Sequence, residues 1–212
     1  MSVFNFHRSG VALLALLALG ACSVLSPSAS PRPSFYTLDR PLDGAAPRAP
    51  TLSLAPTLIV SPTHAAAGFD SPRIIYVREA HRLDYFAHSE WVDPPARMLT
   101  PLLVAAAQAS GSFRAVVLTP TAAAGDMRLD TEIVRLQHDF QSRPSQVRFT
   151  LRVYLIENKT RRVLAWRELD ATVAASSEDA YGGVVAANRA VQTVLAQAAA
   201  FLTDALDKVR WP

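Results

Sequence analysis

The side chains best able to do chemistry in this 212-residue sequence are one cysteine, five histidines and scattered acids. The histidines show neither the HxxH nor the HExxH spacing with which a helix presents two ligands to zinc. No Gly-x-Ser-x-Gly elbow, phosphate-binding loop or dinucleotide fingerprint occurs. We therefore expect no enzymatic activity, no metal site and no cofactor. The residue that remains is Cys22, the only thiol of the chain.

Cys22 closes a short apolar segment at the start of the chain. Arg8 is the only charged residue among the first 22, and residues 11–19 are an unbroken apolar run. This order describes a secretory signal peptide, because a membrane span would need about 20 apolar residues. The motif Leu19-Gly20-Ala21-Cys22 resembles the lipobox of bacterial lipoproteins. That resemblance implies cleavage before Cys22 and acylation, for example with palmitate, of its thiol and of the new amine. The alternative is an ordinary cleavable signal with an incidental cysteine.

Composition limits what the remaining chain can be. Cleavage before Cys22 would leave 212 minus 21, or 191, residues, enough for one domain and a tether. A hydrophobic content of 50% with 18% charged residues indicates a globular protein. Loss of Arg8 would lower the net charge from +3 to +2. Nineteen of the 21 basic residues are arginines scattered along the chain, so we expect no nucleic-acid partner.

Residues 22–50 have the composition of an extended tether. Six prolines alternate with serine, alanine and glycine, which favours a semi-rigid, unpacked chain. The motif Phe35-Tyr36-Thr37-Leu38 interrupts this composition. It is either a strand that docks on the domain's own sheet, which we favour, or a segment that binds a partner. The predicted organisation is a signal peptide at 1–21, a lipidated tether at 22–50 and a domain at 51–212.

The first half of the domain alternates short strands with one helix. Apolar runs predict strands at 57–60, 73–78 and 83–87, the last two as a hairpin, with a loop at 63–71. Asp93-Pro94 predicts a helix N-cap, and residues 99, 102, 103 and 106 form one apolar face. Pro101 predicts either a kink or a helix that begins at Thr100. Gly111 would end this helix, and a strand would follow at 113–118.

The second half has a more regular pattern. Strict alternation predicts strands at 127–133, 147–155 and 162–173, forming an antiparallel meander with one face on the core and one in water. Ser176 and Asp179 are spaced like a capping box ahead of a long amphipathic helix that ends near Trp211. The predicted fold class is therefore α/β (α+β): one domain with a mixed, largely antiparallel sheet flanked by two main helices.

Several side chains are candidates for a surface that docks a partner. Tyr36, Tyr85 and Trp91 could be exposed anchors, although for Tyr85 and Trp91 we favour a place in the core. Four arginines of the meander could form a basic surface that faces anionic head groups or a partner. We favour the simpler interpretation, solubilising charge on an open sheet face. These arginines are Arg135, Arg148, Arg152 and Arg167.

The assembled pattern resembles the ABC-type transport auxiliary lipoprotein family (PqiC-like proteins). The resemblance rests on the lipobox, on Phe35-Tyr36-Thr37-Leu38, which is similar to the family's Tyr-Tyr-x-Leu, and on the terminal Ala/Val helix. Further along the chain it also rests on Ile75-Tyr76-Val77-Arg78, Leu83, Trp91 before Pro94-Pro95, and the Leu99/Leu103 helix. It covers almost the whole mature chain. One departure is Gly68-Phe69-Asp70-Ser71, where the family pattern leads us to expect a Tyr-Leu-like pair.

The resemblance implies a fold similar to the N-terminal domain of TolB. It also implies a periplasm-facing lipoprotein that accompanies an MCE-type ABC transporter moving lipids between the inner and outer membranes. The expected partners are an MCE-family periplasmic protein and the transporter subunits, with the membrane reached through the lipid anchor. An aspartate directly after the lipidated cysteine would resemble an inner-membrane retention signal, but this chain has Ser23 there. We therefore expect the protein to be anchored at the periplasmic face of the outer membrane. A ring-forming homo-oligomer is compatible with the family, but no periodicity requires it.

Two other functions stay open at this point. One is an envelope assembly or stress lipoprotein whose partner is a β-barrel or peptidoglycan. The other is a lipid-anchored hydrolase with a dispersed site. The sequence does not locate a docking surface, and it does not identify the transported lipid or the direction of transport.

Overall fold

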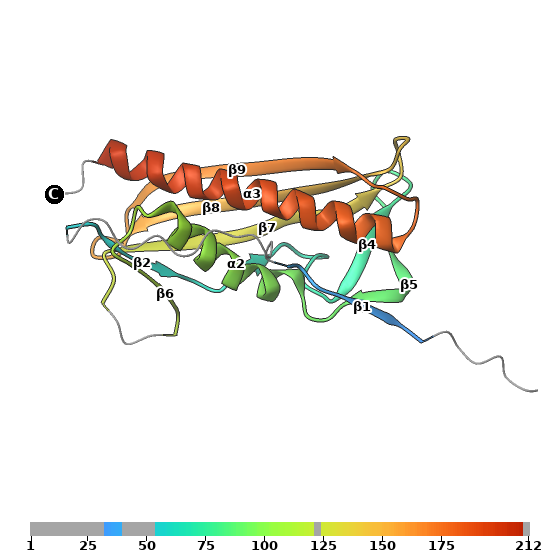
Figure 1. The fold of residues 1–212 in the computed structure, drawn as a ribbon, viewed down its shortest axis with the longest axis horizontal. Helices are drawn as coiled ribbons and strands as arrows, with labels where there is room; N and C mark the ends of the chain where they lie inside the picture. The colour runs from blue at the N-terminus through green and yellow to red at the C-terminus, as the bar shows by residue number, and fades with distance from the viewer. Residues whose placement is uncertain (1–31, 40–53, 121–123, 210–212) are drawn as a thin grey trace, which may run out of the picture. The chain divides into compact units, whose positions relative to one another are not determined.

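A mixed sheet of nine strands, covered on one face by two helices, makes up the part of the chain that the structure describes (Figure 1). The structure is a computed structural model, and it describes residues 32–39, 54–120 and 124–209. Cys22 and the predicted signal peptide lie outside these ranges. The elements are β1 (Ser34–Tyr36), β2 (Thr57–Val60), β3 (His64–Ala65), β4 (Arg73–Val77), β5 (Asp84–Trp91), α2 (Pro95–Ser110), β6 (Ala115–Leu118), β7 (Met127–Asp139), β8 (Gln146–Glu157), β9 (Val163–Ala174) and α3 (Ala180–Val209).

Strand β7 organises the sheet. Strand β8 pairs with one edge of β7 in an antiparallel ladder, and β9 continues that ladder on the far side of β8. The other edge of β7 pairs in turn with β2, β3 and β4, all parallel to it. Strand β5 is antiparallel to β4, and the edge strands β1 and β6 run parallel to β5 and β2. The two longest ladders are antiparallel, and β7 carries parallel strands on its other edge, which confirms the predicted mixed, largely antiparallel sheet.

The core lies between the sheet and the helices. Inward residues of the meander meet across the ladder, as in the pairs Leu129–Leu155 and Ile133–Leu151, which are at most 1% exposed. Alanine and valine residues along α3 are buried against them, since small side chains let the helix approach the sheet closely. Figure 1 shows α2 and α3 on the same face of the sheet, where they pack against each other. The predicted meander with one wet face is confirmed.

A β-bulge makes β7 longer than its sequence pattern predicts. Register shifts between Ile133 and Arg135, so Val134 has no partner on β8. Alternation therefore changes phase, and Leu136 and His138 become the inward residues of the second half of the strand. The prediction ended this strand at residue 133 because a period of two stops there.

Helix α2 begins one residue later than predicted. Pro94 is the N-cap and makes no side-chain capping bond, while Asp93 forms an ion pair with Arg97 at 3.1 Å. Pro101 lies inside the helix, so a start at Thr100 is wrong. The Pro101 ring is exposed, where it displaces no core side chain. Gly111 ends the helix as predicted, with a left-handed φ of 69°.

Helix α3 begins with a cap of a different kind from the predicted one. The Asp179 carboxylate accepts the backbone N–H of Gly182 at 2.8 Å, so Asp179 itself is the N-cap residue. Its neighbour Ser177, rather than Ser176, donates to the same carboxylate. The predicted capping box between Ser176 and Asp179 is therefore wrong, because the helix begins three residues further along than that box requires.

Strand β1 joins the predicted tether to the sheet. Ser34, Phe35 and Tyr36 pair with Ser89, Glu90 and Trp91 of β5, which confirms the docking-strand interpretation. Two side chains of α3 hold the residues that follow. Asn188 accepts the N–H of Asp39 at 2.8 Å, and Gln192 donates to the Asp39 carbonyl at 2.6 Å. This part of the 22–50 segment thus belongs to the same compact unit as the rest of the sheet.

Candidate partner-docking surface

The structure separates the three aromatic residues that the sequence proposed for docking. Trp91 is 3% exposed and lies in the core, as expected, so it presents nothing to a partner. Tyr36 is half-buried, with its ring centroid 6.4 Å from that of Tyr181 on α3. Tyr85 is 51% exposed, so its expected place in the core is wrong. Only Tyr85 offers most of its ring to solvent.

An irregularity in the β4–β5 hairpin explains why Tyr85 and Trp91 point in opposite directions. Arg73 pairs with Glu90, and Ile75 pairs with Tyr85. Between these two pairs the chain covers two residue positions on β4 and five on β5. The three extra residues of β5 reverse its alternation, since an odd insertion moves later side chains to the other face. Strand β5 also continues to Trp91, whereas the prediction ended it at residue 87.

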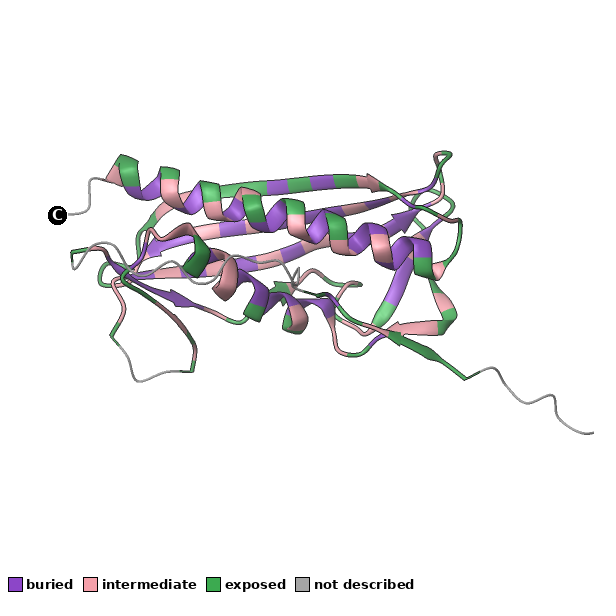
Figure 2. Cartoon of the chain, in the orientation of Figure 1, coloured by how far each residue is buried: buried purple, intermediate pink, exposed green. Residues whose placement is uncertain are grey.

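Side chains from three strands gather on the face of the hairpin that Tyr85 shares. The register places Phe35, Glu90 and Arg73 in one row across β1, β5 and β4, because directly paired residues share a face. The Arg73 guanidinium lies 4.1 Å from the centroid of the Tyr85 ring, a cation–π contact. We call this region the hairpin surface; its members are Phe35, Arg73, Leu83, Tyr85 and Glu90. Figure 2 shows β1 and the adjoining part of β5 as exposed or partly exposed.

An open groove of about 630 Å³ borders the hairpin surface. The loop between β3 and β4 forms one wall, and Leu83 and Tyr85 form the other. Gly68 has a φ of 93°, and a Cβ there would lie 3.3 Å from the Leu83 side chain. Glycine is therefore needed at this point of the wall, both for the backbone conformation and for the close approach. This is the loop in which the sequence departs from the family pattern.

The chemistry of the hairpin surface suits binding to a protein. Phe35 is 59% exposed and Leu83 47% exposed, which leaves apolar area open beside Tyr85. Asp84 is paired with Arg82 at 3.2 Å, whereas Arg73 makes no ion pair with any residue in the described ranges. Tyrosine and arginine are the residue types that most often dominate the energy of protein interfaces. Within the same ranges, no group of three His, Cys, Asp or Glu side chains could hold a metal ion.

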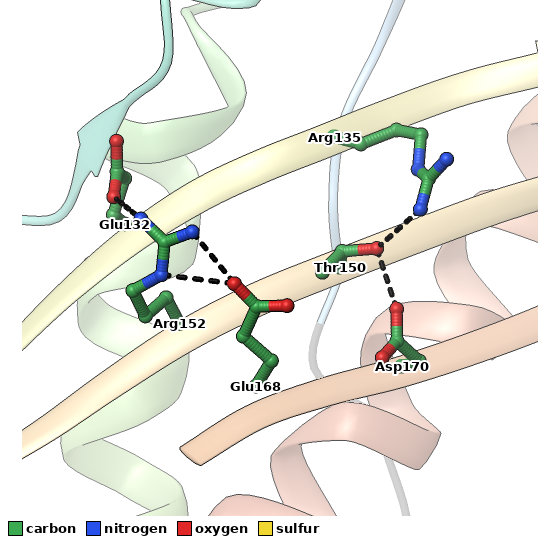
Figure 3. A network of polar contacts seen from close by, with 6 residues as sticks. All are labelled: Glu132, Arg135, Thr150, Arg152, Glu168 and Asp170. Atoms are coloured by element: carbon green, nitrogen blue, oxygen red, sulfur yellow. Dashed lines mark hydrogen bonds and ion pairs between the residues drawn. The ribbon is translucent and has the colours of Figure 1, made fainter. Parts of the chain in front are cut away.

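The four meander arginines do not form a basic surface. Arg152 binds Glu132 at 2.7 Å and Glu168 at 2.6 Å (Figure 3). In the next row Arg135 donates to the Thr150 hydroxyl at 3.2 Å, and that hydroxyl donates to Asp170 at 2.6 Å (Figure 3). Beyond it, Arg148 pairs with Asp139 at 3.4 Å. Arg167 faces the helix side instead, 5.5 Å from the Phe201 ring. Three of the four arginines therefore lie among acids and a hydroxyl on the open face, which favours the interpretation of solubilising charge over that of a basic surface.

No sequence pattern indicated the buried histidine of β7 that packs against the first turn of α3. His138 is 2% exposed, and its Nε2 lies 2.8 Å from the Ser145 hydroxyl. Its ring centroid is 4.2 Å from that of Phe140, and Gly183 passes so close that a Cβ would lie 2.5 Å from Nδ1. The bulge at Val134 turns His138 inward. Only the pairing register of β7 with β8 could have revealed this burial. These contacts join the β7–β8 turn to α3.

We expect His138 to make the fold less stable in mild acid. Burial lowers the pKa of His138, although nearby carboxylates, of which Glu178 acts most strongly, oppose the shift. The unfolded chain, with a histidine pKa of about 6.5, therefore binds more protons than the fold just below that pH. The free energy of unfolding should fall as the pH drops from about 6.5 toward the lower pKa of the folded state.

Urea unfolding between neutral and mildly acidic pH measures this dependence. His138→Gln should flatten it, because glutamine can still reach Ser145 but does not titrate in this range. His81→Gln, at an exposed position in the β4–β5 turn, is the matched control and should keep the slope of the unsubstituted protein. An unchanged slope in His138→Gln would assign the pH dependence to other groups.

None of the described helices is both long enough and apolar enough to cross a bilayer.

A family model described as "ABC-type transport auxiliary lipoprotein component" matches residues 36–199. A search of curated proteins found no match. Among solved structures, protein XCC0632 from Xanthomonas campestris, assigned to family DUF330, is 21% identical over 85% of this chain and 98% of its own, with a TM-score of 0.69. An uncharacterised protein is 13% identical over 82% and 97%, with a TM-score of 0.60. At these identities the two structures share the fold alone.

Proposed function

Because this chain belongs to the ABC-type transport auxiliary lipoprotein family, we propose that it is an accessory subunit of an MCE-type ABC transporter that moves phospholipid between membranes. In this proposal Cys22 carries the acyl chains and holds the protein at the periplasmic face of the outer membrane. The folded unit contributes by binding a partner subunit and catalyses no reaction. The family is one of transport components and is not a known enzyme family, which supports the last point.

The observation that carries the docking part of this proposal is the hairpin surface. It combines an exposed phenylalanine, an exposed tyrosine and an arginine without a carboxylate partner in the described residues, beside an open groove. The aromatic side chains bury large areas on binding at a low cost in conformational entropy, and tyrosine and arginine are enriched among the residues that dominate interface energy. Strand β1 belongs to this surface and directly follows the segment that leads to Cys22. The proposed anchor and the proposed docking surface are therefore neighbours along the chain.

Replacing Leu83 and Tyr85 together by alanine should lower the yield of crosslinked transporter partner by roughly 30-fold or more, because residues that matter in an interface contribute at least about 1 kcal/mol each and about 1.4 kcal/mol is a factor of ten. The test is crosslinking in cells, purification from solubilised membranes and identification of the MCE protein by mass spectrometry. Trp166→Ala is the matched control, since Trp166 is 61% exposed but lies on β9. Its crosslinking yield should be unchanged.

Two results would contradict this proposal. Equal yields from the double variant and the control would exclude the hairpin surface as the docking site. Recovery of a β-barrel or of peptidoglycan, with no MCE or transporter subunit, would favour the alternative function of an envelope assembly or stress lipoprotein. The same purification therefore tests separately where the partner docks and which partner is bound.

A further inference from the structure

The turn between β8 and β9 gathers positive charge at one end of the sheet. Lys159, Arg161 and Arg162 are all exposed, and none makes an ion pair with a described residue. Glu157 is the only acid between residues 157 and 162, and its carboxylate accepts a hydrogen bond from Thr160 inside the turn. The turn therefore presents three cations that nothing in the described fold neutralises.

Apolar and aromatic side chains lie directly beside these cations. Trp166 is 61% exposed and Val163 is 48% exposed. They share the open face although they are three residues apart, because a bulge pairs Val163 with Ile156 and Ala165 with Leu155 and leaves Leu164 unpaired. The Trp166 ring is stacked with that of Tyr154, with centroids 6.3 Å apart and planes inclined at 26°. We call this region the tip surface; its members are Tyr154, Lys159, Arg161, Arg162, Val163 and Trp166.

This arrangement has the chemistry of a membrane-contacting surface. Tryptophan and tyrosine place their rings at the level of lipid headgroups, with the polar edge toward water. Lysine and arginine at the rim reach phosphates while their stems cover apolar surface. Uncompensated cations attract a surface that contains anionic lipid. We propose that the tip surface binds the surface of an anionic phospholipid bilayer directly, in addition to any acyl anchor at Cys22.

The position of the tip surface is compatible with an anchor at the other end of the unit. Met127 of β7 pairs with Glu157 beside the tip, while β4 of the hairpin pairs with His138 and Asp139 at the far end of β7. The twelve residue steps along β7 from Met127 to Asp139, at about 3.4 Å each, separate the two ends of the strand by roughly 40 Å. Residues 22–33 could extend to at most about 40 Å, so Cys22 and the tip surface can reach the same bilayer. The proposal does not depend on docking at the hairpin surface.

Binding to vesicles tests the proposal without the acyl chains. We would use the chain from Ser23 onward, secreted behind an ordinary cleavable signal, because every described strand and helix lies within 34–209 and forms one compact unit. Vesicles with phosphatidylglycerol are compared with vesicles of phosphatidylcholine alone. We expect binding to the anionic vesicles only, weakened by added salt. Neutralising the tip by Lys159→Gln, Arg161→Asn and Arg162→Gln should weaken it by about 100-fold; asparagine suits the left-handed φ of 59° at Arg161.

A matched variant separates location from net charge. Arg78→Gln, Arg97→Gln and Arg189→Gln remove the same charge from exposed positions elsewhere and should bind as the unsubstituted protein does. Brominated lipid should quench the fluorescence of Trp166, and Trp166→Phe should remove that part of the quenching. Leu83→Ala with Tyr85→Ala should leave vesicle binding unchanged. A failure of the membrane-binding proposal can therefore be told apart from a failure of partner docking at the hairpin surface. Equal loss in both charge variants, equal binding to both vesicle types, or no quenching of Trp166 would overturn the proposal.

Discussion

Replacing Cys22 by alanine should abolish incorporation of labelled palmitate into this protein. The reason is chemical: Cys22 is the only thiol, and the lipobox resemblance places acylation on that side chain and on its amine. Each buried methylene of an acyl chain contributes about 0.8 kcal/mol, so acyl chains on both the thiol and the amine give stable membrane anchoring. Metabolic labelling followed by membrane fractionation measures both the modification and its consequence.

Two further variants make the Cys22 result interpretable. Ser23→Ala should keep the label, because it changes the neighbouring residue and leaves the thiol. The chain from Ser23 onward, exported behind an ordinary signal, should move from the membrane pellet to the soluble periplasmic fraction, apart from what the tip surface retains on anionic lipid. If Cys22→Ala still carries the palmitate label, or if the unsubstituted protein carries none, residues 1–22 are an ordinary cleavable signal.

Gly183→Ala should destabilise the fold by about 1–3 kcal/mol, the usual cost of overpacking a filled core. Helix propensity alone predicts the opposite sign, since alanine is favoured over glycine inside a helix by about 1 kcal/mol. The difference arises from His138, whose Nδ1 would lie 2.5 Å from the new Cβ. The ring has little freedom to move, because it is buried, bonded to Ser145 and packed against Phe140. Chemical denaturation measures the change.

Thr193→Ala, on the exposed side of the same helix, controls for propensity and should leave stability unchanged or raise it slightly. A double-mutant cycle with His138→Ala tests the cause, since removal of the ring should make Gly183→Ala much less destabilising. A gain in stability from Gly183→Ala in the unsubstituted background would show that α3 lies further from His138 than the structure places it.

The proposed anchor and the two proposed surfaces have different tasks. Cys22 is proposed to hold the membrane, the hairpin surface to hold the partner and the tip surface to contact lipid headgroups. The variants that test the hairpin and tip surfaces serve as controls for each other. If Leu83→Ala with Tyr85→Ala affects only crosslinking and the tip variant affects only vesicle binding, the two contacts are independent. Loss of both activities in either variant would indicate that one surface performs both tasks.

Local sequence patterns determined most of the elements of this protein. Alternation with a period of two located the meander, and steps of three and four located α2 and α3, because these periods follow from backbone geometry. The apolar run and Cys22 gave the prediction of an anchored lipoprotein, and the ordered motifs gave the family. Phe35-Tyr36-Thr37-Leu38 could be identified as a docking strand, since aromatic and β-branched residues in a proline-rich segment favour pairing.

The tertiary structure decided which surfaces exist. Tyr85 is exposed and Trp91 buried because the hairpin register inserts three residues into β5. His138 meets Gly183, and Val163 shares a face with Trp166, because bulges at Val134 and Leu164 change the phase of β7 and β9. Arg148 and Arg152 are paired with acids because neighbouring strands supply Asp139, Glu132 and Glu168. Register and bulges depend on contacts between residues far apart in the chain, which the period of a single strand does not encode.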